Sequence, residues 1–513
     1  MEQLDNRTHA NPIRTTASEE AKAQIAAMDK HLFGGILWTA AAKWSGQLFS
    51  WGSLVVATRF VSPADFGLVG MAGVYLDIAK IVSQFGFGSA AITLRDLADS
   101  EIKQINTFSV LTAILMFLLS CAVARPLGAF FRSPHLPAVV AVMSVTMLAA
   151  GLQTIPFSLL QREFRFKLLS VSQTTATLFQ AACTLVLACL GYGYWALVSG
   201  IVIGALLSAA VAVYYSPRGF AWPRLKSIHR ALKFSWEVLA AHLSWSFYSD
   251  ADFLVAGRVL GARVLGEYGL SWNLATMPVE RVTALVGQVT PAVFSARQTD
   301  YAELRRYLLI LTEGLSVITF PMGVGLALTA REAVPLIFGR AWVGAVLPLQ
   351  ILAFFGCARS VSALFGALLT AVRDTRYVML NNVSAAVLMP VAFYLGSHWG
   401  AAGIAAAWLI AFPIILFSLC GRTFRKIHLS ATNYFRALRP AINGVVAMAV
   451  AVEIVRLTVL RQTPAWVCLL AEIACGAGAY CGCLLLLHRD RLRAVAQWYR
   501  RMRTAQVAAE GMQ

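Results

Sequence analysis

Apolar segments of about 20 residues recur along the whole of this 513-residue chain. A helix of about 20 residues spans the hydrocarbon core of a bilayer, and helices satisfy their own backbone hydrogen bonds there. Charged residues make up 13% of the chain and hydrophobic residues 58%, whereas charged residues reach about 25% in soluble domains. The sequence therefore predicts an all-α integral membrane protein with many spans.

About fourteen transmembrane helices are predicted from these segments. The polar stretch 1–33 before them lacks the apolar core and cleavage site of a signal peptide. The predicted spans are 34–58, 66–87, 107–128, 137–160, 168–190, 194–215, 234–257, 264–294, 307–329, 343–370, 378–396, 402–420, 438–460 and 465–487.

The loops between these spans carry basic residues mainly on one side. If the N-terminus is cytoplasmic, 30 of the 43 Lys and Arg residues fall on the cytoplasmic side and 8 outside. Positive charge favours the cytoplasmic side of short loops, so both termini are expected in the cytoplasm. The formal net charge of +18 then reports topology rather than binding to nucleic acid, and no nucleic-acid partner is expected.

Two stretches of the chain that lie 199 residues apart are similar in sequence. Val56–Gly70 and Val255–Gly269 share five identities, at Val56, Ala57, Arg59, Gly67 and Gly70 and their counterparts. Each copy lies between the first and second spans of a set of six. The repeat predicts two parallel six-helix bundles, an arrangement of transporters whose site lies between the halves.

This repeat gives the expected division of the chain. The ranges are a cytoplasmic tail (1–33), a first lobe (34–215), a basic cytoplasmic linker (216–233), a second lobe (234–420), a loop with two further helices (421–487) and a basic cytoplasmic tail (488–513).

Several motifs resemble those of bacterial polysaccharide and O-antigen flippases. The family is Wzx-like, with the colanic-acid exporters as the nearest branch, in the multidrug/oligosaccharidyl-lipid/polysaccharide superfamily. The motifs are "RFVSPADFGLVGM", "FGFGSAAI", "LLQREFRFKLLS", "GYGYWALVSG", "MPVERVTALVGQVTPAVFS" and "PLIFGRAWVGAVLPLQIL".

The resemblance implies a MATE-like fold of two six-helix lobes plus two C-terminal helices. It implies translocation of a polyprenyl-diphosphate-linked anionic oligosaccharide across the bacterial inner membrane, for exopolysaccharide or lipopolysaccharide assembly. A polysaccharide polymerase and a chain-length regulator are partners that the family implies, and membrane lipids surround the chain. No cofactor is implied.

Cations inside the predicted spans are the first candidates for substrate contact. Lys43, Lys80, Arg281 and Arg359 are the mid-span cations of the twelve-helix core. A charge at the centre of a span costs about 2.5–3.5 kcal/mol on insertion scales, so such residues usually face a wet cavity or a partner. We expect some of them to bind the diphosphate or acidic sugars, although Lys43 and Arg281 could instead snorkel.

Polar residues on the same helices are candidates for lining the cavity or coupling transport to an ion. They form helical stripes with i, i+3, i+4 or i+7 spacing. They are Asp77, Gln84, Asp250, Asn273 and Glu280. Asp77 could equally be a structural partner of Lys80, and a proton or sodium ion is the candidate coupling ion.

Other functional classes find less support. The chain lacks G-x-x-x-x-G-K-[ST], H-E-x-x-H and G-x-S-x-G motifs, which argues against an enzyme, and its nine cysteines form no C-x-x-C pair, which argues against a metal site. A cation-coupled multidrug antiporter and a lipid II flippase of the same superfamily stay open as alternatives.

Overall fold

In the computed structural model, residues 46, 49–94, 96–163, 165–224, 226–458 and 463–489 are described, and every regular element within these ranges is a helix. Residues 49–57 form the end of a first helix. The elements that follow are α2 (Pro63–Gln84), α3 (Phe87–Thr93), α4 (Asp99–Phe131), α5 (Leu136–Met143), α6 (Val145–Arg162), α7 (Phe166–Cys189), α8 (Tyr194–Tyr215), α9 (His229–Ser249), α10 (Ala251–Val255), η1 (Ala256–Leu260), α11 (Gly261–Ala296), α12 (Tyr301–Ile337), η2 (Arg340–Ala345), α13 (Val346–Ala371), α14 (Thr375–Gly396), η3 (Ser397–Trp399), α15 (Gly400–Ile427), α16 (Ala431–Thr458) and α17 (Ala465–Leu487).

Most of the described helices overlap the predicted spans, while most of the first span, 34–58, lies outside the described residues. Helices α8 and α17 coincide with spans 194–215 and 465–487, because Gly193 and Pro464 precede them directly. Ten segments of the described residues are long and apolar enough to cross a membrane, and one of them, Thr375–Ile427, contains both α14 and α15. Helices α9 and α11 are outside that set; α11 carries the predicted polar residues Asn273 and Glu280, and Asp250 directly follows α9.

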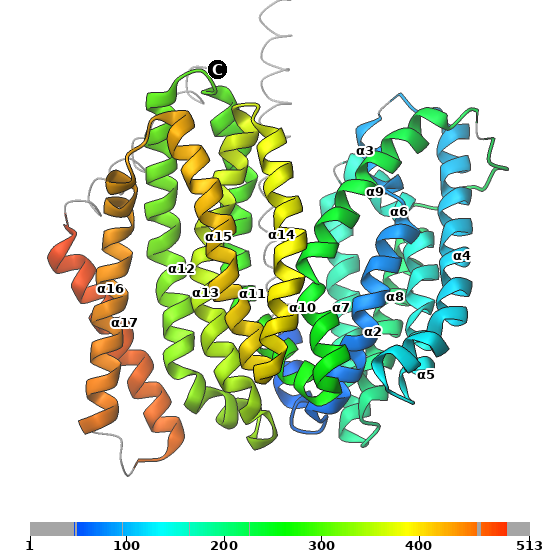
Figure 1. The fold of residues 1–513 in the computed structure, drawn as a ribbon. Helices are drawn as coiled ribbons and strands as arrows, with labels where there is room; N and C mark the ends of the chain where they lie inside the picture. The colour runs from blue at the N-terminus through cyan, green and yellow to red at the C-terminus, as the bar shows by residue number, and fades with distance from the viewer. Residues whose placement is uncertain are drawn as a thin grey trace, which may run out of the picture.

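The helices form two groups that meet at one end (Figure 1). The first group contains α2 to α8, and the second contains α11 to α15 with α16 and α17 along its outer flank. The groups diverge toward the upper side in Figure 1, where the basic 216–228 connection lies. We call this the basic side, and the positive-inside pattern predicts that it is cytoplasmic.

At the opposite side, α2 crosses α11 with backbone against backbone. A Cβ atom on Gly67 would lie 1.6 Å from the carbonyl oxygen of Ala262, and one on Gly266 would lie 1.9 Å from that of Pro63. Any side chain larger than hydrogen would therefore force the two helices apart. Gly67 and Gly266 are equivalent residues of the sequence repeat, so the crossing is symmetric in sequence as well as in space.

Two equivalent arginines of the repeat add contacts between the two helix groups at this side. Arg59, which precedes α2, donates from Nε to the carbonyl oxygen of Ile337 at the end of α12, over 3.0 Å. Its counterpart Arg258 places its guanidinium 5.2 Å from the ring centre of Phe130 at the end of α4. Each arginine thus contacts the other helix group, which holds the two groups together on the side away from the basic loops.

The predicted span 234–257 is not one helix, and that prediction was wrong. Helix α9 ends at Ser249, Asp250 has non-helical angles, and α10 then passes into a π-helical turn, η1. Near its start α9 packs on the first group, because a Cβ on Gly86 would meet the carbonyl oxygen of Ser235 at 2.7 Å. Helix α9 also packs against α14 of the second group, so it contacts both groups.

The last two helices are fixed to the second group by one arginine. Arg456 of α16 contacts Glu472 at 3.0 Å, Glu332 at 3.2 Å and Glu453 at 3.3 Å. It also donates to the carbonyl oxygen of Leu328 over 2.8 Å. This guanidinium joins α16, α17 and α12, and its partners satisfy it within the protein.

The glycine crossing gives a first testable expectation. Gly67→Ala should lower the melting temperature of the purified protein by about 2–4 °C or more, because backbone contact must be broken to admit a methyl group. The matched control is Gly73→Ala on the same helix, where no atom lies within 4 Å of the added Cβ. Fluorescence-monitored thermal melting checks this, and equal melting of both variants would contradict the close crossing.

Candidate functional site

Helix α2 presents its predicted polar residues away from the packed core. Asp77 and Lys80 are exposed, and Gln84 at the end of the helix is partly buried. Among the described residues Lys80 forms no ion pair, although it is close enough to Asp77 to interact electrostatically. The carboxylates of Asp77 and Asp250 are also near enough to repel each other. The structure therefore brings Asp77 of α2 close to Asp250, the residue between α9 and α10.

Helix α11 carries the corresponding set in the second group. Asn273, Glu280 and Arg281 are exposed, and the Asn273 Nδ2 donates to the carbonyl oxygen of Gly269 over 2.8 Å. Glu280 is 14 residues beyond the crossing glycine Gly266, and Lys80 is 13 beyond Gly67. At 1.5 Å per residue both lie about 20 Å from the crossing, at similar depth on the two diverging helices.

The guanidinium of Arg359 on α13 faces α11. Its Nη2 lies 3.1 Å from Oε1 of Glu280, and its Cζ lies 5.6 Å from the ring centre of Trp272. Its Nη1 is buried and has no hydrogen-bond partner among the described residues. Arg359 has no charged neighbour along its own span, but the fold places Glu280 of α11 beside it. Its Nη1 is left available as a hydrogen-bond donor.

A cavity of 220 Å³ lies beside this arginine, and we call it the Arg359 pocket. It is formed by α11 and α13. Its lining residues are Thr276, Val279, Glu280, Thr283, Gly356, Arg359, Ser360, Ser362 and Ala363. The pocket offers a cation and several hydroxyl groups to a ligand.

A second cavity of 220 Å³, the Gln84 pocket, lies in the first group. It is formed by α2, α3, α6 and α9. Its lining residues are Ile81, Gln84, Gly86, Gly88, Ser89, Gln153, Thr154, Phe157, Ser158, Leu239 and His242. Of these, only Gln84 was among the predicted site residues; none of the others carries a fixed charge that would have drawn attention to it.

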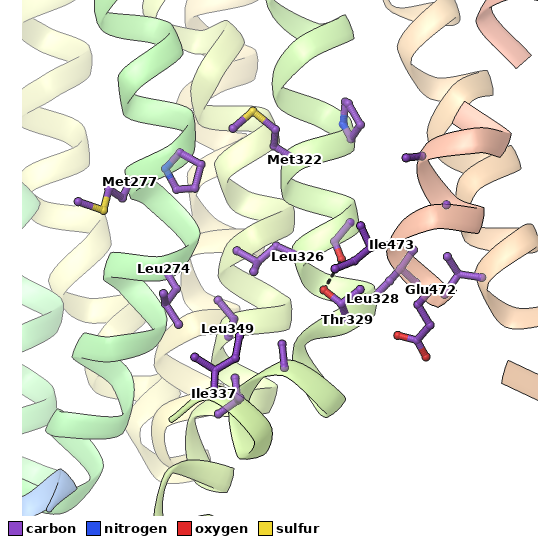
Figure 2. A pocket seen from close by; sticks show the side chains of 18 of the residues that line it. Leu274, Met277, Met322, Leu326, Leu328, Thr329, Ile337, Leu349, Glu472 and Ile473 are labelled. Carbon is purple, nitrogen blue, oxygen red and sulfur yellow. Dashed lines mark hydrogen bonds between the residues drawn. The ribbon is translucent and has the colours of Figure 1, made fainter. Parts of the chain in front are cut away.

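A larger apolar groove of 670 Å³ opens between α11, α12 and α17 (Figure 2). Leu274 and Met277 of α11 face Met322 and Leu326 of α12, and Ile473 of α17 faces them across the groove. Trp51, Leu54 and Val55 of the first helix also line it. The sequence analysis did not predict this groove, because hydropathy does not show which apolar faces stay unpacked.

The structure also reveals a buried acid that the sequence analysis did not select. Asp252 of α10 is 0% exposed. Its Oδ2 accepts hydrogen bonds from the Tyr268 hydroxyl (2.5 Å) and from Nε1 of Trp408 (3.0 Å), while its Oδ1 accepts one from the amide of Phe253 (2.9 Å). The only sequence signal was an aspartate within a span, because Trp408 lies 156 residues away.

The predicted site residues thus fall into four kinds. Glu280 forms an ion pair with Arg359, the carboxylates of Asp77 and Asp250 are near enough to repel each other, and Gln84 lines a pocket. Lys80, Arg281 and Asn273 are exposed on the diverging helices without being brought into a shared cluster by the described contacts. Lys43 lies outside the described residues. Within the part of the chain that the structure describes, no group of three His, Cys, Asp or Glu side chains could hold a metal ion.

The sequence of residues 56–347 matches the family described as "Polysaccharide biosynthesis protein". The chain belongs to this family. Its relatives include the lipopolysaccharide biosynthesis protein WzxC of Escherichia coli K12, 25% identical over 74% of this chain and 79% of WzxC. The succinoglycan biosynthesis transport protein ExoT of Rhizobium meliloti is 24% identical over 89% of this chain and 93% of ExoT. Like these family members, the chain is a membrane transporter of polysaccharide biosynthesis rather than an enzyme.

Solved structures show the same fold at low sequence identity. The lipid II flippase MurJ in an inward closed conformation superposes with a TM-score of 0.74 at 14% identity, over 89% of this chain and all of MurJ. An inward-facing multidrug MATE transporter gives 0.56 at 15% identity, over 74% of this chain and 95% of the transporter. These likenesses confirm the predicted MATE-like helical fold.

Replacing Asp252 should destabilise the second helix group. In Asp252→Asn one acceptor becomes a donor whichever way the amide is turned, so at least one buried donor loses its partner, at about 1–3 kcal/mol. We expect a lower melting temperature of the purified protein. Asp250→Asn, two residues away and only partly buried, is the control; a similar melting temperature for both variants would show that Asp252 is not the acceptor described.

Proposed function

We propose that the chain transfers a polyprenyl-diphosphate-linked oligosaccharide from the cytoplasmic to the outer leaflet of a bacterial inner membrane. Relatives named for lipopolysaccharide, succinoglycan and teichuronic acid biosynthesis support a glycan substrate class. Both termini are then cytoplasmic, on the basic side. A polysaccharide polymerase and a chain-length regulator are the proposed partners after transfer.

Arg359 carries the substrate assignment. A half-buried guanidinium with one nitrogen free of hydrogen bonds, beside a cavity, is suited to an oxyanion. The stacking of Arg359 on Trp272 and its contact with Glu280 hold the planar group in place. A diphosphate is the anion that every polyprenyl-linked glycan of this class shares.

Lys80 and Arg281 supply further positive charge at the same depth. Both are exposed, and they stand on α2 and α11, which diverge from the glycine crossing. Lysine acts as a point charge and arginine can contact phosphate with two donors. We assign them, with Lys43, to attraction and binding of the diphosphate or of acidic sugars.

The apolar groove supplies a place for the polyprenyl chain. Most of the side chains that line it are apolar. It borders α11, the helix that also forms the Arg359 pocket. Leu274 and Met277 face the groove while Thr276 and Glu280 face the pocket. A lipid with an apolar tail and an anionic head matches the two faces of this helix.

Transfer requires that the closed side opens in turn. In alternating access, the contacts that Gly67, Gly266, Arg59 and Arg258 make would separate while the basic side closes. Pro278, within α11 between the groove and Glu280, is suited to a bend at this level. A proton or sodium ion at Asp77, Asp250 or Glu280 is the proposed source of coupling.

Two alternatives within the superfamily are less favoured. A multidrug antiporter for cationic drugs would require an acidic site, whereas Arg359 places a cation in the charged pocket. The likeness to the lipid II flippase rests on fold at 14% identity, while the family match covers residues 56–347 in the polysaccharide branch.

Loss of the three cations should abolish export. The variant Lys80→Gln/Arg281→Gln/Arg359→Gln, expressed in a strain whose own copy is deleted, should lower surface polysaccharide at least about tenfold, because charge-assisted contacts to the diphosphate are lost. The matched control, Lys233→Gln/Arg297→Gln/Arg376→Gln, removes three exposed cations of the basic side and should export normally. Full export by the first variant at equal protein level would reject the assignment.

Filling the apolar groove should also reduce export. Ala477 of α17 lines the groove, so Ala477→Trp should occupy space meant for the polyprenyl chain and lower surface polysaccharide several-fold. Ala474→Trp places the same side chain on the same helix, at an exposed residue outside the groove lining. Equal export by the two variants would argue against a tail-binding groove.

A further inference from the structure

The Gln84 pocket and the Arg359 pocket occupy corresponding places in the two halves. Each lies between the second and fourth spans of its set, at α2 and α6 in the first and α11 and α13 in the second. Gln84 and Thr283, which line them, are separated by the repeat distance of 199 residues. The two pockets are therefore equivalent in architecture, although their side chains differ.

The chemistry of the Gln84 pocket is polar without fixed charge. Its lining contains two glutamines, three hydroxyl residues and one histidine, and none of its residues is Asp, Glu, Lys or Arg. An anion would find no cation there, and a cationic ligand would find no carboxylate. A neutral ligand with many hydroxyl groups fits this lining best.

Hydrogen-bonding capacity in the pocket is available for such a ligand. Oε1 of Gln153 accepts from the hydroxyl of Ser208 over 2.8 Å, which orients the amide and leaves its NH₂ group to donate. Ser158 donates within its own helix, to Thr154, so its oxygen can still accept. Within the described residues, Gln84 and His242 have no hydrogen-bond partner.

The size and walls of the pocket suit a single sugar ring. At 220 Å³ it is smaller than the roughly 300–1,000 Å³ of pockets for drug-sized ligands. Phe157 adds an apolar face against which the C–H groups of a pyranose can pack. Gly88 leaves the space beside the Ser158 hydroxyl open, because a Cβ there would lie 2.8 Å from that oxygen.

We propose that the Gln84 pocket is a subsite for a neutral sugar ring of the lipid-linked substrate, while the Arg359 pocket binds its diphosphate. This inference rests on the proposed function and divides recognition between the two halves. The equivalent helix pairs, α2 with α6 and α11 with α13, would then bind hydroxyl groups in the first half and a negative charge in the second.

Two lipids separate the roles of the pockets. Purified full-length protein in nanodiscs is titrated with undecaprenyl diphosphate and with undecaprenyl diphosphate bearing one hexose, glucose or galactose. Wild type should bind at least one hexose-bearing lipid more tightly than the bare diphosphate. Gln84→Ala/His242→Ala should weaken the preferred hexose lipid about tenfold and leave the bare diphosphate within a factor of two. Arg359→Gln should weaken both.

The control for the glutamine is Gln298→Ala, in the exposed turn between α11 and α12, which should change neither affinity. Equal weakening of both lipids by Gln84→Ala/His242→Ala would overturn the subsite, because it would show a structural role. Wild type that binds bare and hexose-bearing lipids equally would also overturn it. If wild type binds none of these lipids, the proposed function itself fails.

Discussion

The backbone contact between α2 and α11 at Gly67 and Gly266 determines how the rest of the molecule is arranged. The two helices touch at their backbones on one side and diverge toward the other side (Figure 1). The polar residues of both helices lie about 20 Å beyond the contact. A closed apolar side and a polar, diverging side thus follow from one pair of residues that have no side chain.

Charges inside the spans can be sorted by how completely the protein satisfies them. Arg456 contacts three carboxylates and a carbonyl oxygen, which is what an arginine that fixes helices requires. Arg359 has one acid, one aromatic ring and one open nitrogen. Since a buried unsatisfied donor is costly, we propose that the substrate binds to this open nitrogen.

Hydropathy predicted the helices, and the family resemblance predicted their arrangement. Most of the contacts between side chains of different helices could not be predicted from the sequence. Spans such as 194–215 are set by local signals, a glycine before and a polar linker after, and they were predicted to the residue. The break at Asp250 was missed because the sequence is apolar on both sides of it, so 234–257 was predicted as one span. Asp252 was passed over because its partners, Tyr268 and Trp408, come from other helices. The sequence shows that Gly67 and Gly266 are equivalent residues of the repeat, but only the structure shows that α2 and α11 contact each other there.

The two halves share a backbone plan and differ in the chemistry that they present, which suits the ligand that we propose. A lipid-linked glycan is itself asymmetric, with an apolar tail, an anionic linkage and a hydroxyl-rich head. Helices α16 and α17 lie along the second group, and α17 forms one wall of the apolar groove. The Arg359 pocket lies on the same helix as that groove, and the uncharged Gln84 pocket lies in the opposite half. In the arrangement that we propose, the order tail, charge, sugar in the ligand corresponds to the order groove, Arg359 pocket, Gln84 pocket across the molecule, and separation of the halves would change the distance between the last two.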